Sequence, residues 1–345
     1  MSLGIVTDQK DMYKMKNKTS KVSVICAAYN QAAFIRSALD GFVSQKTNFN
    51  FQVFVYDDAS TDGTTDIIRE YAEKYPDIIK PIIQTENQFS KGTNVAEAFI
   101  WPKINTEYVA VCDGDDYWCD ENKLQKQVDF LDKHPDYTIC FHSVDIFWDD
   151  KSQSGCIWPT KKQARDTSLN KLLHGNFIPN CSVMYRWQAN GLDLEKEWPK
   201  NIYPGDWFLH LLHARQGKIG FLPQVMARYR RHAGGISFVS DYGLEELHKK
   251  YGLKELNFYL ELEKKVAPDP KQYHKFVCSQ ARGILDAYSK HKDLESATQV
   301  LKLCPDLMMD YASKAEVERW HHNFNNSIIV GSIMLIIAIV VGVLL

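Results

Sequence analysis

The chain has 345 residues, of which 45% are hydrophobic and 24% are charged, a composition that predicts a packed globular core. Its formal net charge at pH 7 is -2, whereas a protein that binds nucleic acid through its overall charge is usually distinctly basic. Composition and charge therefore argue against a general nucleic-acid binder, and we expect no nucleic-acid partner.

The first residues lack an apolar stretch, so we expect a polar arm over residues 1–20 and no signal peptide. From residue 21, apolar runs alternate with stretches of helical spacing. This pattern predicts strands within 21–30, 51–58, 78–84 and 106–113, and helices within 31–44, 64–75, 93–99 and 121–134. Thr64 or Thr65 is the expected N-cap of the second helix. The alternation predicts an α/β fold, with helices on both faces of a parallel, doubly wound sheet.

Beyond residue 137 the pattern is mixed, with strands expected near 137–147, 180–186 and 225–232 and a helix near 205–215. Residues 241–325 are charge-laced and mostly helical in character. The expected layout is therefore one α/β domain over residues 21–240, followed by a helical extension over 241–325.

The last 18 residues, from Ile328 to Leu345, carry no charge. A helix of that length spans about 27 Å, close to the roughly 30 Å hydrocarbon core of a bilayer. We therefore predict a transmembrane helix over residues 326–345, with a buried core helix as the alternative. Basic residues and histidines precede this run, which predicts a cytoplasmic catalytic domain anchored by a single C-terminal helix.

Eight cysteines are spread along the chain, and no two form a C-x-x-C pair, which argues against a zinc ribbon. Cys26 and Cys112 lie inside apolar strand-like runs, where cysteine behaves as a small hydrophobic residue. We expect a reducing compartment and no disulfide framework.

Two of the predicted strands end in carboxylates, at Asp57-Asp58 and at Asp113-Gly114-Asp115-Asp116. In an open parallel sheet, ligands bind beyond the carboxyl ends of the strands. Carboxylates this close repel one another, and a divalent cation shared with a diphosphate would relieve that repulsion. Mg²⁺ and Mn²⁺ prefer such hard oxygen ligands, and Gly114 would let the backbone turn tightly. The alternative is a surface turn in which the acids cap the next helix.

Four segments resemble, in this order, the family-2 glycosyltransferases of the GT-A fold: VSVICAAYNQAAFIRSALDGFVSQ, VYDDASTDGTTDII, DGDDYW with KLQKQVDFL, and YRRHAGGIS. The resemblance covers residues 21–240 and implies a Rossmann-like GT-A domain with a mixed sheet. It further implies an inverting hexosyl- or N-acetylhexosaminyltransferase that uses a nucleotide-diphosphate sugar, with UDP-sugar favoured, and Mn²⁺ or Mg²⁺ as cofactor.

The resemblance also implies roles for single residues. The nucleotide-sugar would be bound by the first strand end, the acids of the second, the D-x-D element and the basic loop: Ala28, Tyr29, Asn30, Asp57, Asp58, Asp113, Gly114, Arg230 and Arg231. The implied metal ligands are Asp115, Asp116 and His232. Asp206 matches the catalytic base, although family members often carry Glu-Asp where this chain has Gly205-Asp206. Asp206 could instead serve only as a helix N-cap.

The apolar C-terminus favours an acceptor at a membrane, either a glycan or a lipid-linked sugar of cell-surface polysaccharide or glycolipid synthesis. Two other functions remain open. A sugar nucleotidyltransferase also places acids at strand ends, but it usually carries a Gly-rich phosphate loop, which this chain lacks. A catalytically degenerate domain that binds glycan or acts as a scaffold would have no need of Asp58, Asp115 and Asp206.

Overall fold

The structure is a computed structural model that describes residues 19–151, 153–235 and 243–308. These residues form two compact units: residues 19–195 with 210–232, and residues 196–209 with 233–308. The predicted transmembrane helix over 326–345, and all but the last two residues of the predicted N-terminal arm, lie outside the described residues. Among the helices that are described, none is both long enough and apolar enough to cross a bilayer.

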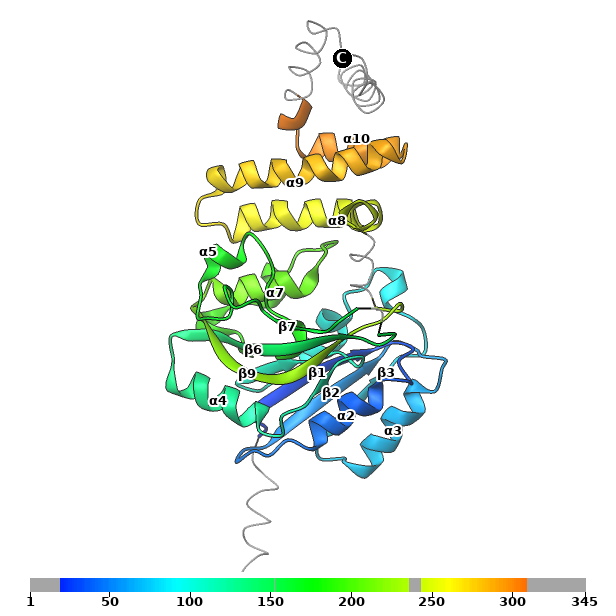
Figure 1. The fold of residues 1–345 in the computed structure, drawn as a ribbon, viewed down its shortest axis with the longest axis vertical. Coiled ribbons are helices and arrows are strands. Elements are labelled where there is room, and N and C mark those ends of the chain that lie inside the picture. Colours follow the sequence, from blue (N-terminus) through cyan, green and yellow to red (C-terminus); the bar gives the residue numbers. More distant parts are fainter. Residues whose placement is uncertain (1–18, 152, 236–242, 309–345) are drawn as a thin grey trace, which may run out of the picture. The chain divides into compact units, whose positions relative to one another are not determined.

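Within the described residues, the first unit is built on a nine-stranded mixed sheet (Figure 1). Its strands are β1 (Val22–Ala28), β2 (Phe51–Asp57), β3 (Ile79–Ile83), β4 (Tyr108–Val111), β5 (Tyr117–Trp118), β6 (Tyr137–Trp148), β7 (Cys156–Trp158), β8 (Met184–Arg186) and β9 (Lys218–Arg231). The strand order is β3-β2-β1-β4-β8-β6-β9-β5, with β7 paired to β6. β1 to β4 are parallel, as predicted, whereas β8 is antiparallel to both of its neighbours.

The positions of β1 and β3 in the sheet explain their sequences. β1 lies between β2 and β4 and is buried along nearly all of its length, which accounts for its unbroken apolar run. Pro81 does not interrupt β3, because β3 lies at the edge of the sheet, where a missing N–H can be tolerated. β9 begins well before the strand predicted near 225–232, and the short strands β5 and β7 were not predicted.

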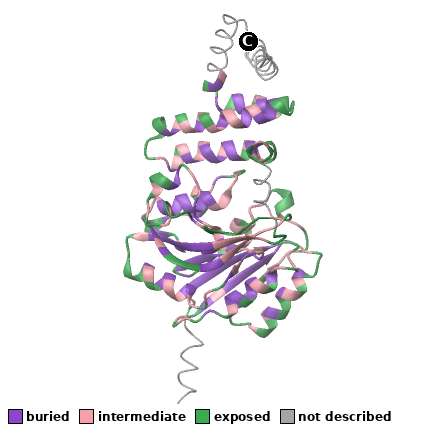
Figure 2. Ribbon diagram, in the orientation of Figure 1, coloured by how far each residue is buried: buried purple, intermediate pink, exposed green. Residues whose placement is uncertain are grey.

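Helices cover both faces of the sheet, as the sequence predicts. On one face, α2 (Ile35–Val43), α3 (Thr64–Lys74) and α4 (Lys123–Lys133) share one apolar core with the strands, which Figure 2 shows as buried. On the other face, Tyr56 stacks on Phe99 of the short helix η2 (Ala96–Ile100), and Tyr185 contacts His213 near the end of α7 (Gly205–Ala214). The helix predicted within 93–99 is therefore only the single turn η2, whose hydrogen bonding is of the π type.

The predicted N-cap of α3 is wrong. Gly63, with φ +98°, occupies the cap position, and Thr64 is already the first helical residue. The Thr64 hydroxyl accepts a hydrogen bond from Gln31 N at 2.8 Å, and the Thr65 hydroxyl donates to Asp57. Both threonines therefore tie the start of α3 to the strand ends.

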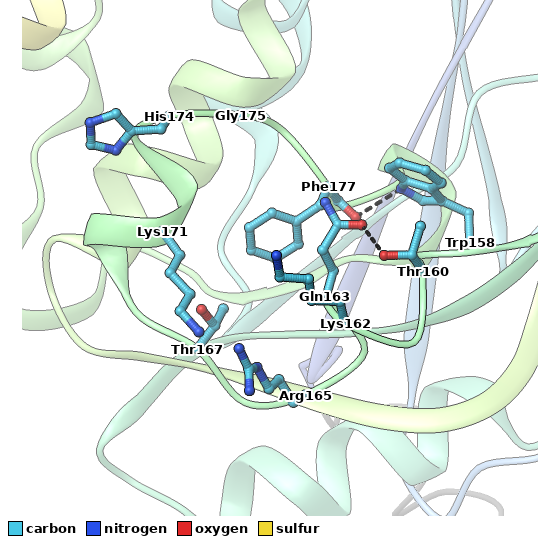
Figure 3. A pocket seen from close by; sticks show the side chains of 10 residues that line it. All are labelled: Trp158, Thr160, Lys162, Gln163, Arg165, Thr167, Lys171, His174, Gly175 and Phe177. Carbon is cyan, nitrogen blue, oxygen red and sulfur yellow. Dashed lines mark hydrogen bonds between the residues drawn. The ribbon is translucent and has the colours of Figure 1, made fainter. Parts of the chain in front are cut away.

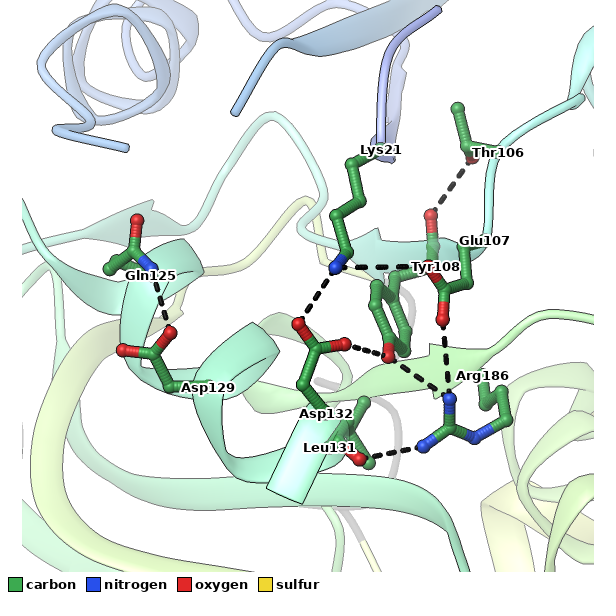
Figure 4. A network of polar contacts seen from close by, with 9 residues as sticks. All are labelled: Lys21, Thr106, Glu107, Tyr108, Gln125, Asp129, Leu131, Asp132 and Arg186. Atoms are coloured by element: carbon green, nitrogen blue, oxygen red, sulfur yellow. Dashed lines mark hydrogen bonds and ion pairs between the residues drawn. The ribbon is translucent and has the colours of Figure 1, made fainter. Parts of the chain in front are cut away.

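A polar network fixes the amino ends of the central strands (Figure 4). Tyr108, at the start of β4, donates from its hydroxyl to Asp132 of α4 at 2.5 Å, and Lys21 lies 2.7 Å from the same carboxylate. Arg186 of β8 donates to the Tyr108 hydroxyl at 3.0 Å and to the Leu131 carbonyl at 2.7 Å. These contacts join β4, β8 and α4 at the edge of the sheet opposite the acidic strand ends.

The described part of the second unit is mainly helical, as predicted, with α8 (Leu244–Lys265), α9 (Pro270–Lys290) and α10 (Leu294–Leu303). The carboxylates of Asp269 and Asp293 cap α9 and α10. The three helices bury apolar side chains that include Leu256, Phe258, Leu262, Val277, Ile284 and Val300. The short helices α5 (Leu169–Leu172) and α6 (Leu194–Glu197) precede α7 in the sequence.

Candidate active site

The carboxyl ends of β2 and β4 flank that of β1 on the same edge of the sheet. Asp57 pairs with Ala28 in the β1–β2 register, and Asp58 N donates to the Ala28 carbonyl at 3.1 Å. On the other side, Gly114 N donates to the Ala27 carbonyl at 2.9 Å, so the chain follows β1 beyond the end of β4. Both predicted acidic strand ends therefore lie beside one central strand, where open α/β sheets bind their ligands.

Gly114 is required by close packing. A Cβ at this position would lie 2.5 Å from Gln31 Oε1, 2.6 Å from Ile35 Cδ1 and 3.2 Å from Ala28 Cβ. The backbone turns tightly here, as predicted, because Asp116 N donates to the Asp113 carbonyl at 3.1 Å. Gly114 is not among the described residues with positive φ, so the turn itself does not require a glycine. The glycine instead lets the acidic loop lie against the start of α2.

The acids that end β2 are buried and hold their own loops. Asp57 accepts hydrogen bonds from the hydroxyls of Ser60 and Thr65. Asp58 accepts from the Tyr56 hydroxyl at 2.8 Å and from the backbone amides of Gln88 and Phe89 at 2.8 and 3.0 Å. These contacts shape the loops after β2 and β3, and the contact of Asp58 with the nucleotide-sugar stays a prediction.

Just beyond the end of β1, hydrogen bonds fix Asn30, whereas Tyr29 is exposed. Asn30 has φ 51°, its N–H donates to Ser60 Oγ at 2.8 Å, and its side-chain oxygen accepts from Thr61 N at 2.9 Å. Tyr29 is 48% exposed, so its ring is accessible at this edge of the sheet. An accessible aromatic ring suits the predicted contact with a nucleotide.

Asp115 and His232 meet although they lie 117 residues apart in the sequence. Asp115 Oδ2 is 3.0 Å from His232 Nε2, and their side chains are 20% and 13% exposed. The Phe34 ring packs against the imidazole, with ring centroids 4.6 Å apart. The structure therefore joins the end of β4 to the segment after β9.

This pair fits a divalent cation. Two ligands at adjacent corners of an octahedron, each about 2.1 Å from the metal, lie about 3.0 Å apart, close to the distance between Asp115 and His232. Imidazole nitrogen is a softer ligand than carboxylate oxygen, so this pair is better suited to Mn²⁺ than to Mg²⁺.

Asp116 does not lie beside Asp115 and His232 as a third metal ligand. Its side chain is buried, and its Oδ1 accepts a hydrogen bond from Arg230 N of β9 at 2.8 Å. Burial, and secondarily the charge of Asp115, raise the pKa of Asp116 well above the usual range of an aspartate. Among the described residues, the three predicted metal ligands do not form a group with all ligand atoms within 4.8 Å of one another.

Arg230 supports the acidic loop. Its Nε donates to the Asp115 carbonyl at 2.9 Å, its Nη1 pairs with Asp149 at 2.6 Å, and its guanidinium lies 4.6 Å from the Phe34 ring centroid. These contacts make Arg230 a positioning residue for Asp115, and its contact with the nucleotide-sugar stays a prediction. Arg231 packs near the Tyr229 ring, and its predicted role is likewise untested.

Asp206 lies in the first turn of α7 and belongs to the second unit, whereas the acidic strand ends belong to the first. In the same unit, burial raises the pKa of Tyr203 above its usual range, and the charges of Tyr251 and Asp206 add to this effect. The role of Asp206 as catalytic base stays a prediction.

Sequence reasoning missed several residues that shape the site. Phe34 contacts both His232 and Arg230, Asp149 pairs with Arg230, and Asn180 Nδ2 donates to Asp113 Oδ2 at 3.0 Å. No local motif marks them, because each comes from a different helix, loop or turn of the first unit.

The first unit also contains a pocket of about 480 Å³ that the sequence did not indicate (Figure 3). Its lining includes the cationic side chains of Lys162, Arg165 and Lys171, beside the aromatic rings of Trp158 and Phe177. None of the predicted site residues lines it. The cationic lining suits an anionic group such as a phosphate.

The sequence of this chain is similar to a known protein family and to individual known proteins. Residues 23–191 match Glycosyl transferase family 2. An uncharacterized glycosyltransferase of Nostoc sp. is 30% identical over 252 residues, which cover 70% of this chain and 74% of the relative. An uncharacterized protein of Mycobacterium tuberculosis is 44% identical over 215 residues, or 62% of this chain. That alignment covers 60% of the mycobacterial protein, less than two thirds of its length.

Two solved structures share the fold. S. aureus TarS 1-349 in complex with UDP-GlcNAc has a TM-score of 0.59 at 16% identity, covering 92% of this chain and 90% of that one. The mannosyltransferase PcManGT from Pyrobaculum calidifontis, in complex with GDP-Man and Mn²⁺, has a TM-score of 0.53 at 17% identity, covering 94% and 87%. At such identities the likeness shows the fold, a GT-A-like mixed sheet with helices and a C-terminal helical region.

Proposed function

Because the chain belongs to Glycosyl transferase family 2, we propose that it moves a sugar from a nucleotide-diphosphate donor to a hydroxyl group of a glycan or lipid-linked acceptor. The product would be a cell-surface polysaccharide or glycolipid. The observation that carries the proposal is the pairing of Asp115 with His232 beside the carboxyl end of β1, where a donor diphosphate and its metal would bind.

The donor site comprises the ends of β1, β2 and β4, with UDP-sugar as the favoured donor. TarS was solved with UDP-GlcNAc and PcManGT with GDP-Man, so proteins of this fold hold both kinds of nucleotide. Tyr29 is accessible for contact with the base, while Asn30 fixes the turn beside it. Asp58 and Asp113 would contact the nucleoside, and Arg230 and Arg231 the diphosphate.

A divalent cation, Mn²⁺ or Mg²⁺, fits Asp115 and His232, and when bound it would neutralise charge on the departing diphosphate. Arg230 donates a hydrogen bond to the Asp115 carbonyl, and the Arg230 amide donates one to Asp116. These two hydrogen bonds fix the backbone of the acidic loop that carries Asp115. Asp116 acts as a buried support in this account and not as a ligand.

Inversion requires a base that accepts the acceptor proton while the hydroxyl attacks the face of the sugar opposite the leaving group. We assign this role to Asp206, at the start of α7. The cationic pocket lined by Lys162, Arg165 and Lys171 supports an acceptor that carries phosphate, as a lipid-linked sugar does.

The test is release of nucleotide diphosphate by the purified full chain from a panel of UDP- and GDP-sugars, with and without Mn²⁺. Asp115→Asn should abolish the Mn²⁺-dependent release while preserving the backbone carbonyl that Arg230 binds. Asp129→Asn, at an exposed acid of α4, is the matched control and should behave as wild type. Metal-independent release, or an unaffected Asp115→Asn variant, would contradict the proposal.

We also propose that the apolar run from Ile328 to Leu345 anchors the protein to a membrane, with its catalytic domain in the cytoplasm. A chain truncated before Ile328 should move from the membrane fraction to the supernatant and still consume donor. A truncated chain that stays with the membranes, or that aggregates, would indicate a different role for this segment.

A further inference from the structure

Two cysteines and a histidine converge in the second unit, away from every residue assigned to sugar transfer. His274 and Cys278 lie one turn apart on α9, and Cys304 follows the last residue of α10. Their ligand atoms lie within 4.8 Å of one another, the one such group of three potential metal ligands among the described residues. Cys304 is fully buried, whereas His274 and Cys278 are partly exposed.

The spacing of the side chains resembles the edges of a tetrahedron around zinc. Cys278 Sγ lies 3.4 Å from Cys304 Sγ and 3.4 Å from His274 Nε2. With Zn–S distances of about 2.3 Å and a Zn–N distance of about 2.1 Å, the corresponding edges would be about 3.8 Å and about 3.6 Å. Small adjustments would therefore accommodate the ion.

Two carboxylates complete the surroundings of His274. Glu263 of α8 lies 3.0 Å from His274 Nδ1, so it can accept the Nδ1 proton and leave Nε2 as the metal-binding nitrogen. Asp306 Oδ2 lies 3.0 Å from Nε2, beside the position that a metal would take. The Asp306 side chain is 70% exposed, so it is able to move and supply a fourth ligand.

A disulfide does not account for this arrangement. The two sulfur atoms are 3.4 Å apart, whereas a disulfide bond is about 2.05 Å long. A disulfide would also leave the approach of His274 and its two carboxylates unexplained. A site of soft thiolates and one imidazole binds Zn²⁺ in preference to Mg²⁺ or Mn²⁺.

We infer that His274, Cys278 and Cys304 form a structural zinc site, with Asp306 as the fourth ligand and Glu263 as the acceptor of the His274 Nδ1 proton. Binding replaces the two thiol protons, which pass to solvent, while the histidine remains neutral. The ion joins α9 to the end of α10, and Glu263 links α8 to the same site. The site thus stabilises the second unit, and the inference does not depend on the proposed transferase activity.

The experiment uses the full chain, stripped of metal with a chelator and titrated with Co²⁺ as a spectroscopic substitute for Zn²⁺. Binding should give about one ion with a thiolate-to-cobalt absorption band, and Zn²⁺ should displace it and raise the thermal unfolding midpoint. Cys278→Ser and Cys304→Ser should lose most of the band. Cys156→Ser, at an exposed cysteine on β7, is the matched control and should keep it.

Two further variants distinguish this site from the donor site and test the role of Glu263. Asp115→Asn should leave the thiolate band intact, because Asp115 and His232 include no sulfur ligand. Glu263→Gln should weaken Zn²⁺ binding by about 10- to 100-fold, the usual loss when such a supporting carboxylate is removed. A wild-type chain that shows no thiolate band on addition of Co²⁺ would overturn the inference, even if a cysteine variant fails to fold.

Discussion

Replacing Gly114 by alanine tests how closely the acidic loop packs against α2. The new methyl group would lie 2.5 Å from Gln31 Oε1 and 2.6 Å from Ile35 Cδ1, both shorter than any ordinary contact. Ile35 is fully buried, so its side chain cannot turn into solvent to make room. Overpacking of this kind typically costs about 1–3 kcal/mol. At about 2–4 °C per kcal/mol for a domain of this size, the unfolding midpoint should fall by about 2–12 °C.

The same substitution should lower activity more than stability alone would explain. Gly114 lies between Asp113 and Asp115, so a shift of the loop away from Ile35 displaces the carboxylates on both sides. A displacement near 1 Å at a reacting centre can reduce the rate by about 100-fold. We therefore expect a fall in transfer of about 10- to 100-fold at temperatures where the variant is fully folded.

The assay pairs thermal unfolding with donor turnover. Gly175→Ala is the control, because a Cβ at Gly175 meets no atom within 4 Å and should leave the unfolding midpoint unchanged. If Gly114→Ala has the wild-type midpoint and rate, the described packing of the acidic loop against α2 is incorrect.

Two other predictions concern carboxylates with different surroundings. Asp206→Asn should keep the unfolding midpoint and donor affinity, because asparagine caps a helix about as well as aspartate, but transfer should fall by about 10² to 10⁴; near-normal transfer would leave Asp206 as a helix cap only. The pKa of Asp116 is raised in the folded state, so folding favours the protonated acid. This stabilisation is complete below the ordinary pKa of 3.8 and is lost as pH rises toward the folded pKa. In chelator, the wild-type midpoint minus that of Asp116→Asn should therefore fall as pH rises from 3.8, and a difference that grows with pH would contradict the burial of this carboxyl group.

Much of the fold could be predicted because the signal is local. The buried strands β1, β2 and β4 read as apolar runs, and their acidic ends follow directly in the sequence. The direction of these strands follows from the alternation with helices, which places both sets of acids at one edge.

The rest depends on contacts between distant segments. Asp115, Asp116 and His232 look like equal candidates in the sequence, but only the fold turns Asp116 inward to Arg230 N and brings His232 to Asp115. The cysteine spacing gave no sign of a metal site either, because Cys278 lies on α9 and Cys304 follows α10, and only the fold brings their sulfur atoms to 3.4 Å from each other.

The most direct test of the central claim is calorimetric titration of the full chain with UDP, in the presence and absence of Mn²⁺. We predict that Mn²⁺ strengthens UDP binding to the wild type, and that Asp115→Asn and His232→Ala each remove this gain while Asp129→Asn retains it. Equal UDP affinity with and without Mn²⁺, or a gain that survives in both site variants, would contradict the assignment of Asp115 and His232 as the metal-binding pair.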